Sequence, residues 1–323
     1  MKRFSLLLIM SLFLMVLAAC GSSEESSEGE GENAEGEETS EETNETVTVN
    51  HELGETEVPK NPENVVVFDF GILDTLDTLG VDVAGVAQGN IPSYLEKYES
   101  DTYENIGSLK EPDFDKVAEI DPDVIIISGR QASVADQLEE IAPTIHLGVD
   151  TTRYMDSFEE NMETVGEIFG KEAEIEEELT RIEDSIASVN DKAAENEENG
   201  LIILANDDKI SAYGPSSRFG LIHDVLGVPA VDEGIEASTH GMNVSPEYVM
   251  EEDPDLLYVV DRTAAITDDN SAAEQIVEND LIKNTKAYEN DNIFYLDPDY
   301  WYLSGGGLAS VSEMINEIDA SLE

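Results

Sequence analysis

The residues best suited to hold a charged ligand are three arginines that follow predicted strands or turns. Arg130 comes just after the apolar run Val124–Ser128, and Arg262 comes after a similar run in the second half of the chain. Arg218 lies in the segment YGPSSRFG, whose Gly and Pro mark a turn before a predicted helix. Arginine stays charged at physiological pH, and its planar fork pairs with two anionic oxygens. This set indicates a site for an anion.

Two of these arginines belong to a repeated unit. Residues 121–130 and 253–262 both begin with Asp-Pro-Asp after a predicted helix, and both end in Arg nine positions after the first Asp, 132 residues apart. Ligands of parallel α/β sheets bind at the carboxyl ends of the strands. Two lobes that face each other would therefore place Arg130 and Arg262 in the crevice between them.

Further candidates lie in loops of the second half. His240 sits in the small, polar loop ASTHGMNVS, and residues 296–308 read LDPDYWYLSGGGL, with three aromatic residues before three glycines. The sequence has no G-x-G-x-x-G, no Walker A loop and no H-E-x-x-H. Residues 214–218 lack the final Gly of a nucleophile elbow. The chain is therefore expected to bind a ligand rather than to catalyse a reaction.

The start of the chain predicts export. Residues 1–19 suit a signal peptide, because two positive residues precede an apolar run that is short for a membrane span. The run ends in Leu-Ala-Ala-Cys, which resembles the bacterial lipobox, so Cys20 is the predicted lipidation site. Residues 20–46 are rich in Glu and almost free of large apolar residues, which predicts a disordered acidic tether.

The charge balance is extreme: 16 Lys and Arg stand against 74 Asp and Glu, a formal net charge of −58 over 323 residues. A surface this acidic argues against a nucleic-acid partner, because phosphate binding needs basic patches. We interpret the acid excess as adaptation to high salt, in which a dense carboxylate surface stays hydrated. Cys20 is the single Cys, which excludes an internal disulfide and a cysteine-rich zinc site.

The remaining chain predicts an α/β fold of two Rossmann-like lobes joined by a single long helix, with the ligand cleft between the lobes. Apolar runs at Val65–Phe70 and Leu201–Ala205 are the first buried strands of the two lobes. The N-terminal lobe is expected over residues 47–153 and the C-terminal lobe over residues 198–323.

The linking helix is predicted over residues 154–197. This stretch is rich in Glu, Ile, Leu and Ala and contains no Pro. Gly166 and Gly170 weaken the helical pattern locally, which marks the place where a break would fall. Two α/β lobes joined in this way form a cleft with a stiff hinge.

Several ordered motifs resemble those of bacterial ferric-siderophore binding lipoproteins of ABC importers. They read YGPSSRFGLIHDVLG, ASTHGMNVSPEYV, DPDLLYVVDR and WYLSGGGL, and the resemblance covers about residues 47–323. More narrowly, the chain looks like the branch that binds catecholate siderophores such as petrobactin. The resemblance implies the helix-linked two-lobe fold, with little hinge motion on binding.

In that branch, three basic residues face the anionic iron–catecholate complex, and a His/Tyr pair can bind the iron directly. Carried over by motif, the residues implied to contact the ligand are the basic Arg130, Arg218 and Arg262, the neighbouring Trp301, and the iron ligands His240 and Tyr302, with Tyr300 as the substitute for Tyr302. Relatives often carry a Lys three residues after the first Arg, where this chain has Ser133. The contact from the first lobe is therefore expected to be weaker, or suited to a less charged ligand.

The resemblance implies a lipid-anchored receptor on the outer face of a cell membrane, which delivers a ferric catecholate-type siderophore to an ABC permease and its ATPase. We expect a monomer with no intrinsic cofactor. Acidic residues on each lobe would dock on the permease, and Asp74, Asp77 and Asp224 are candidates. The nearest alternative is the same fold binding haem, a cobalamin or a hydroxamate siderophore. Alternatives of other classes are an extracytoplasmic metal-dependent hydrolase and a surface adhesin.

Overall fold

The computed structural model describes residues 45–267 and 272–323. They form two five-stranded sheets and a separate antiparallel hairpin of β1 (Thr46–His51) and β2 (Gly54–Pro59). The predicted signal peptide, the lipidation site Cys20 and all but the end of the acidic tether lie outside the described residues. Within the described part, no helix is both long and apolar enough to cross a membrane.

The N-terminal sheet is fully parallel, with the strand order β5-β4-β3-β6-β7. Its strands and main helices are β3 (Val65–Val67), β4 (Gly85–Val86), β5 (Glu104–Asn105), β6 (Val124–Ile127), β7 (Thr144–His146), α1 (Phe70–Thr78), α2 (Phe114–Ile120) and α3 (Ala135–Glu139). The strand order reverses between β3 and β6, the place at which open α/β sheets bind ligands. The loops that follow these two strands carry Asp69 and Arg130.

The C-terminal sheet has the order β10-β9-β8-β11-β12, in which β8, β11 and β12 are parallel and β9 and β10 run antiparallel. Its strands and short helices are β8 (Gly200–Asn206), β9 (Lys209–Tyr213), β10 (Met242–Val244), β11 (Leu256–Asp261), β12 (Ile293–Leu296), α6 (Leu221–Asp224), α7 (Pro246–Glu252), α8 (Arg262–Ile266), α9 (Ala272–Val277) and α10 (Lys286–Glu289). Here the order reverses between β8 and β11, and Arg262 follows β11 directly.

The predicted repeat of helix, Asp-Pro-Asp turn and strand is present in both halves. Asp121 and Asp253 end α2 and α7 in the left-handed conformation, with φ of 54° and 48°. The second aspartate of each motif then accepts a hydrogen bond from the backbone N–H just before the first strand of the sheet, at 2.8 Å for Asp123 and 3.3 Å for Asp255. The repeat thus fixes β6 beside β3 and β11 beside β8.

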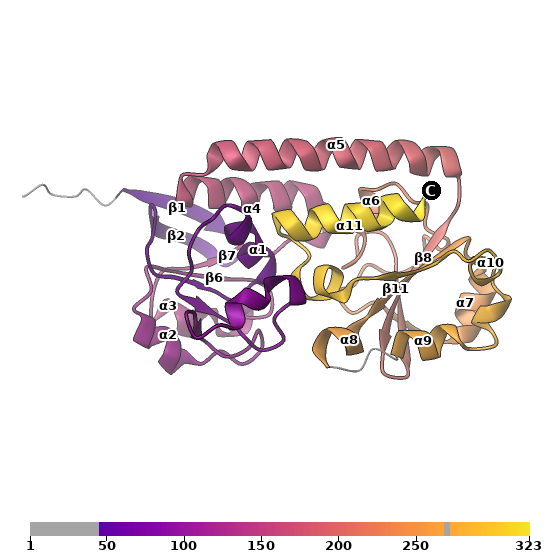
Figure 1. Cartoon of the computed structure of the whole chain (residues 1–323), viewed down its shortest axis with the longest axis horizontal. Helices are drawn as coiled ribbons and strands as arrows, with labels where there is room; N and C mark the ends of the chain where they lie inside the picture. The colour runs from indigo at the N-terminus through magenta and orange to yellow at the C-terminus, as the bar shows by residue number, and fades with distance from the viewer. Residues whose placement is uncertain (1–44, 268–271) are drawn as a thin grey trace, which may run out of the picture. The chain divides into compact units, whose positions relative to one another are not determined.

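The helical stretch predicted over residues 154–197 is two helices, α4 (Tyr154–Phe169) and α5 (Glu172–Asn196). Gly170 ends α4 with a φ of 62°, which a glycine adopts without strain, and the chain then folds back so that α5 packs on α4 (Figure 1). The long linking helix is therefore α5, and it starts at Glu172 rather than at residue 154.

One apolar core continues through both halves of the described chain. In β8, Ile202 and Leu204 face this core, whereas Leu201 and Ile203 face a second cluster beneath α7, α9 and α10. The C-terminal sheet is therefore covered on both faces.

The C-terminal helix α11 (Leu308–Ser321) contacts both α5 and α1. Asp74 of α1 caps its N-terminus, because the carboxylate accepts hydrogen bonds from the backbone N–H groups of Ala309 and Ser310, each at 3.1 Å, and from the hydroxyl of Tyr94 at 3.1 Å. Burial raises the pKa of Asp74 to about 7, and the hydrogen bonds act in the opposite direction.

Asp74 is 1% exposed, so its carboxylate cannot reach a partner protein and its predicted role in permease docking is wrong. The backbones of the two helices meet beside it: a Cβ atom on Gly307 would lie only 2.0 Å from the carbonyl oxygen of Gly71. The last helix of the chain is thereby fixed to the first helix of the N-terminal sheet.

The Asp74→Ala variant is expected to lower the free energy of unfolding by about 3 kcal/mol, because the buried N–H of Ser310 and the part-buried N–H of Ala309 lose their acceptor and Tyr94 keeps only Ser304. Asp77→Ala is the matched control one turn further along α1; its carboxylate forms a partly exposed ion pair with Lys97, so the loss should stay below about 1 kcal/mol. Urea unfolding followed by circular dichroism measures both. Equal losses would contradict the capping role.

Candidate ligand-binding site

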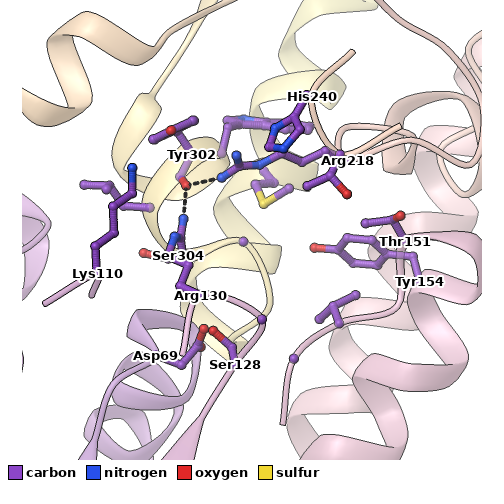
Figure 2. Close-up of a pocket in the computed structure, with 18 residues that line it drawn as sticks. Asp69, Lys110, Ser128, Arg130, Thr151, Tyr154, Arg218, His240, Tyr302 and Ser304 are labelled. Atoms are coloured by element: carbon purple, nitrogen blue, oxygen red, sulfur yellow. Dashed lines mark hydrogen bonds between the residues drawn. The ribbon is translucent and has the colours of Figure 1, made fainter. Parts of the chain in front are cut away.

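Tyr302 lies at the centre of the site, on the π-helical turn Asp299–Ser304 between β12 and α11. The turn is held from both sides. The indole N–H of Trp301 donates to Glu317 of α11 at 2.6 Å, and the carboxylate of Asp299 accepts a hydrogen bond from the backbone N–H of Ser93 at 2.7 Å. Short π-helical segments are rare and frequent at functional sites. This one directs the carbonyl and the ring of Tyr302 toward a cavity (Figure 2).

The three predicted arginines converge on Tyr302. The guanidinium groups of Arg130 and Arg218 both donate to its carbonyl oxygen, at 2.8 and 2.6 Å (Figure 2). Nε of Arg262 donates to its phenolic oxygen at 2.8 Å. The guanidinium carbon of Arg218 also lies 4.2 Å from the centre of the Tyr302 ring. Tyr302 is therefore contacted by arginines from both halves of the chain.

This cluster carries positive charge that no carboxylate of the described residues neutralises. Burial alone would raise the pKa of Tyr302, but Arg218, Arg262 and Arg130 together outweigh burial and lower that pKa below the usual value for a tyrosine. The pKa of Arg218 is lowered, first by burial and then by the neighbouring charge of Arg130. An anion entering the cavity would relieve this repulsion.

The cavity measures about 580 Å³ and is lined by residues from both halves. The N-terminal half contributes the loop after β6, including Ser128, and the start of α4 with Tyr154; the C-terminal half contributes the arginine cluster around Tyr302 and His240. Asp69 is the acidic residue in this wall, and its carboxylate is used to cap α1 by accepting from the N–H of Ile72 at 2.9 Å.

The other predicted site residues differ in how they face the cavity. His240 lies on an exposed loop in the cavity wall. Trp301 lines the edge but is 2% exposed, with its N–H committed to α11, so it contributes surface rather than a hydrogen bond. Tyr300 packs its ring 4.7 Å from the ring of Tyr94, outside the lining of the cavity. Of the two candidate tyrosines, Tyr302 is thus the one that faces the cavity.

Lys110 also lines the cavity, although no motif of the sequence predicts it there. Its exposed side chain reaches toward Tyr302 (Figure 2). The side-chain amide of Gln131, next to the first arginine of the cluster, donates to the carbonyl of Leu109 at 2.5 Å and holds the lysine loop in place. Ser133, where relatives often carry a Lys, is exposed and outside the lining. No spacing in the sequence relates Lys110 to the arginine motifs.

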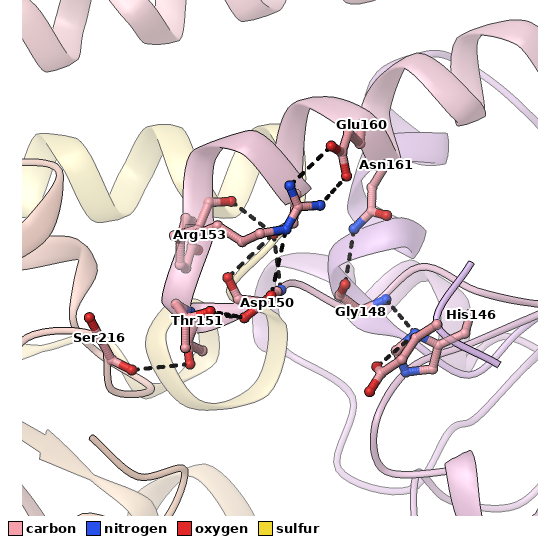
Figure 3. A network of polar contacts seen from close by, with 12 residues as sticks. His146, Gly148, Asp150, Thr151, Arg153, Glu160, Asn161 and Ser216 are labelled. Atoms are coloured by element: carbon pink, nitrogen blue, oxygen red, sulfur yellow. Dashed lines mark hydrogen bonds and ion pairs between the residues drawn. The ribbon is translucent and has the colours of Figure 1, made fainter. Parts of the chain in front are cut away.

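The basic residues of this site differ from most others in the described chain, because they form no ion pairs with carboxylates. Arg153, for example, is held by Glu160 and Asp150 (Figure 3). The lysines and arginines that form ion pairs with carboxylates are Lys97, Lys116, Arg153, Lys171, Arg181, Lys192, Lys283 and Lys286. Within residues 45–267 and 272–323, those that form none are Lys60, Lys110, Arg130, Lys209, Arg218 and Arg262. All of the unpaired cations except Lys60 line the cavity or a smaller cavity beside it.

The chain is similar to known proteins over its whole length. A family model described as a periplasmic binding protein matches residues 65–300. The petrobactin-binding protein YclQ of Bacillus subtilis is 52% identical over 100% of both chains. The chain belongs to the periplasmic binding protein family. Members of this family bind ligands and are not enzymes, so the chain is a binding protein.

Solved structures of this family share the fold. The crystal structure of YclQ aligns with a TM-score of 0.85 and 55% identity, covering 86% of this chain and 99% of that one. The catecholate-siderophore binding protein VctP of Vibrio cholerae gives a TM-score of 0.82 and 32% identity, covering 85% and 100%. YhfQ of Bacillus subtilis, described as a putative ABC transporter substrate-binding lipoprotein, is 30% identical over 99% of both chains. The predicted two-lobe α/β fold is therefore confirmed.

The two remaining docking candidates of this binding protein both have partners within the chain. Asp77 forms an ion pair with Lys97 and accepts a hydrogen bond from the hydroxyl of Tyr98 at 3.0 Å. Asp224 is exposed, but it accepts a hydrogen bond from the backbone N–H of Ser216 at 2.5 Å and so shapes the turn before Arg218.

The described residues contain no group of three or more His, Cys, Asp or Glu that could hold a metal, as a metal-dependent hydrolase would require.

Arg218→Gln is expected to raise the free energy of unfolding of the ligand-free protein by about 1 kcal/mol, because it removes one of two cations that share a single carbonyl. The paired Arg181 of α5 serves as the control: Arg181→Gln breaks exposed contacts with Glu177 and Glu178 and should not stabilise the protein. Thermal and urea unfolding without ligand make the measurement. Destabilisation by Arg218→Gln would show that the cluster is not under repulsion.

Proposed function

We propose that this chain is an extracytoplasmic receptor that binds a ferric catecholate-type siderophore and delivers it to an ABC importer for iron uptake. The observation that carries the proposal is the distribution of cations. In a chain of net charge −58, five of the six described arginines and lysines that form no ion pair line the main cavity or the smaller cavity beside it; Lys60 is the exception. Such a cavity selects a ligand with several negative charges in a small volume.

Ferric catecholate complexes have this property. Their anionic oxygens lie in pairs around the metal, which suits the planar fork of arginine. Where the siderophore leaves positions on Fe(III) open, we assign them to Tyr302 and His240. A phenolate is a hard oxygen donor suited to Fe(III), and imidazole is also acceptable. The lowered pKa of Tyr302 supports this role, because it makes loss of the phenolic proton easier.

The relatives support the same ligand class. YclQ is named for petrobactin and VctP for catecholate siderophores, and both cover nearly the whole folded part of this chain. We extend the proposal to a monomeric protein held on the outer face of the membrane by lipid on Cys20, with an ABC permease and its ATPase as partners. Asp77 and Asp224 remain the acids that we propose for permease docking.

Titration of the single tryptophan tests the ligand class. Trp301 lies at the edge of the cavity, so a bound ferric complex should quench its fluorescence in a saturable way. We expect quenching by ferric bis- and tris-catecholates and none by a ferric hydroxamate, haem or cobalamin. The Arg218→Ala, Arg262→Ala double variant should weaken catecholate binding by about 100-fold, since two charge-assisted contacts are lost. Saturable quenching by haem or cobalamin alone would keep the fold and refute the ligand class.

Lys110 provides a second test with a matched control. Lys110→Ala should weaken binding of a ferric tris-catecholate roughly tenfold at low ionic strength, and less at high salt because the partly exposed charge is screened. Lys60 is also unpaired but lies outside the cavities, so Lys60→Ala should leave the affinity unchanged. Equal losses in the two variants would show that overall charge, rather than contact in the cavity, controls the affinity.

A further inference from the structure

A smaller cavity of about 190 Å³ lies beside the main one. The two share Arg218, Thr239, His240 and Tyr302 in their walls, so a ligand in the main cavity borders the smaller one directly. We call the smaller one the side cavity. Its remaining walls come from β8, β9, β10 and Arg262 of the C-terminal half.

The lining of the side cavity is basic and rich in hydrogen-bonding groups. It contains Lys209 at the start of β9, Asn206 at the end of β8, and Asn243 and Ser211 on the antiparallel strands. No carboxylate lines it, although the described chain is densely acidic elsewhere. Lys209 forms no ion pair with any described residue, so its charge is available to a ligand.

Arg262 connects the two cavities. Its Nε donates to the phenolic oxygen of Tyr302 at 2.8 Å, and its Nη1 donates to Oδ1 of Asn206 at 2.8 Å. The guanidinium is therefore fixed at both ends between the proposed iron site and the side cavity. The loop that carries Lys209 is also anchored, because the backbone N–H of Asp207 donates to the hydroxyl of Thr263 at 2.9 Å. The fold thus fixes the guanidinium of Arg262 and the backbone before Lys209, whose exposed side chain extends from it.

We propose that the side cavity binds a second anionic group of the ligand, a free carboxylate outside the coordination sphere of the iron. This inference rests on the proposed function. At pH 7 the catecholate oxygens are taken up by the metal, so they are not free to bind in the side cavity. A carboxyl group is ionised at that pH, and it suits the arginine and lysine donors of this lining. Lys209 and Arg262 would hold it, with the amide of Asn243 as a neutral donor.

A matched pair of ligands separates this contact from iron binding. Bis(2,3-dihydroxybenzoyl)lysine and bis(2,3-dihydroxybenzoyl)-1,5-diaminopentane present the same two catechols on the same spacer, and only the first carries a carboxylate. We expect the full chain to bind the ferric complex of the first about tenfold more tightly in the fluorescence titration. In Lys209→Gln this preference should fall below about threefold, whereas Lys60→Gln should retain it.

Asn243→Leu provides a second variant from a different strand, and it should reduce the same preference. Thermal unfolding of each ligand-free variant checks that it is folded. If the wild-type chain binds both complexes equally, the side cavity does not recognise a carboxylate, and the proposed function still stands. If the preference survives in both Lys209→Gln and Asn243→Leu, the carboxylate binds elsewhere and the inference is wrong. If the wild-type chain binds neither complex, the proposed function itself fails, and the inference with it.

Discussion

The site depends on one arrangement of charge: two guanidinium groups donate to the carbonyl of Tyr302, and a third donates to its phenol. A carbonyl and a phenol supply only partial negative charge, so they orient the arginines without neutralising them. A carboxylate in the same place would form a closed ion pair and would compete with an anionic ligand. The arginines are therefore already oriented, and their charge is still available to an anionic ligand. Such preorganisation lowers the entropy cost of binding.

Such a cluster needs a rigid framework, because like charges would otherwise separate. The π-helical turn fixes Tyr302 through the indole of Trp301 on one side and Ser93 of the N-terminal half on the other. Asp74 adds a second link between the halves, since its buried carboxylate caps α11 from α1. These contacts join α11 and the turn before it to the N-terminal half of the fold, beside the cavity. The stability of the fold and the geometry of the site thus depend on the same contacts.

The acidic surface and the basic cavity are compatible because electrostatic interactions in salt are short-ranged. At 1 M salt the Debye length is about 3 Å, so surface carboxylates act weakly across the protein while direct contacts persist. The donor distances around Tyr302, 2.6 to 2.8 Å, lie within that range. Most other described cations are held by neighbouring carboxylates. The anionic ligand that we propose would therefore be recognised by local contacts rather than by the overall field of the protein.

The sequence by itself determined the local chemistry and the repeated architecture. The Asp-Pro-Asp motifs predicted two equivalent strand units because αL caps and apolar strands are encoded within a few residues. These short motifs, together with the family resemblance, also predicted the three arginines that contact Tyr302. What the tertiary structure decided were relationships between distant segments. Lys110 reaches the cavity through a loop that Gln131 holds, Tyr302 faces inward while Tyr300 packs on Tyr94, and Asp74 is buried by a helix 235 residues later. No local pattern specifies these contacts, because burial and side-chain direction depend on which surfaces meet after folding.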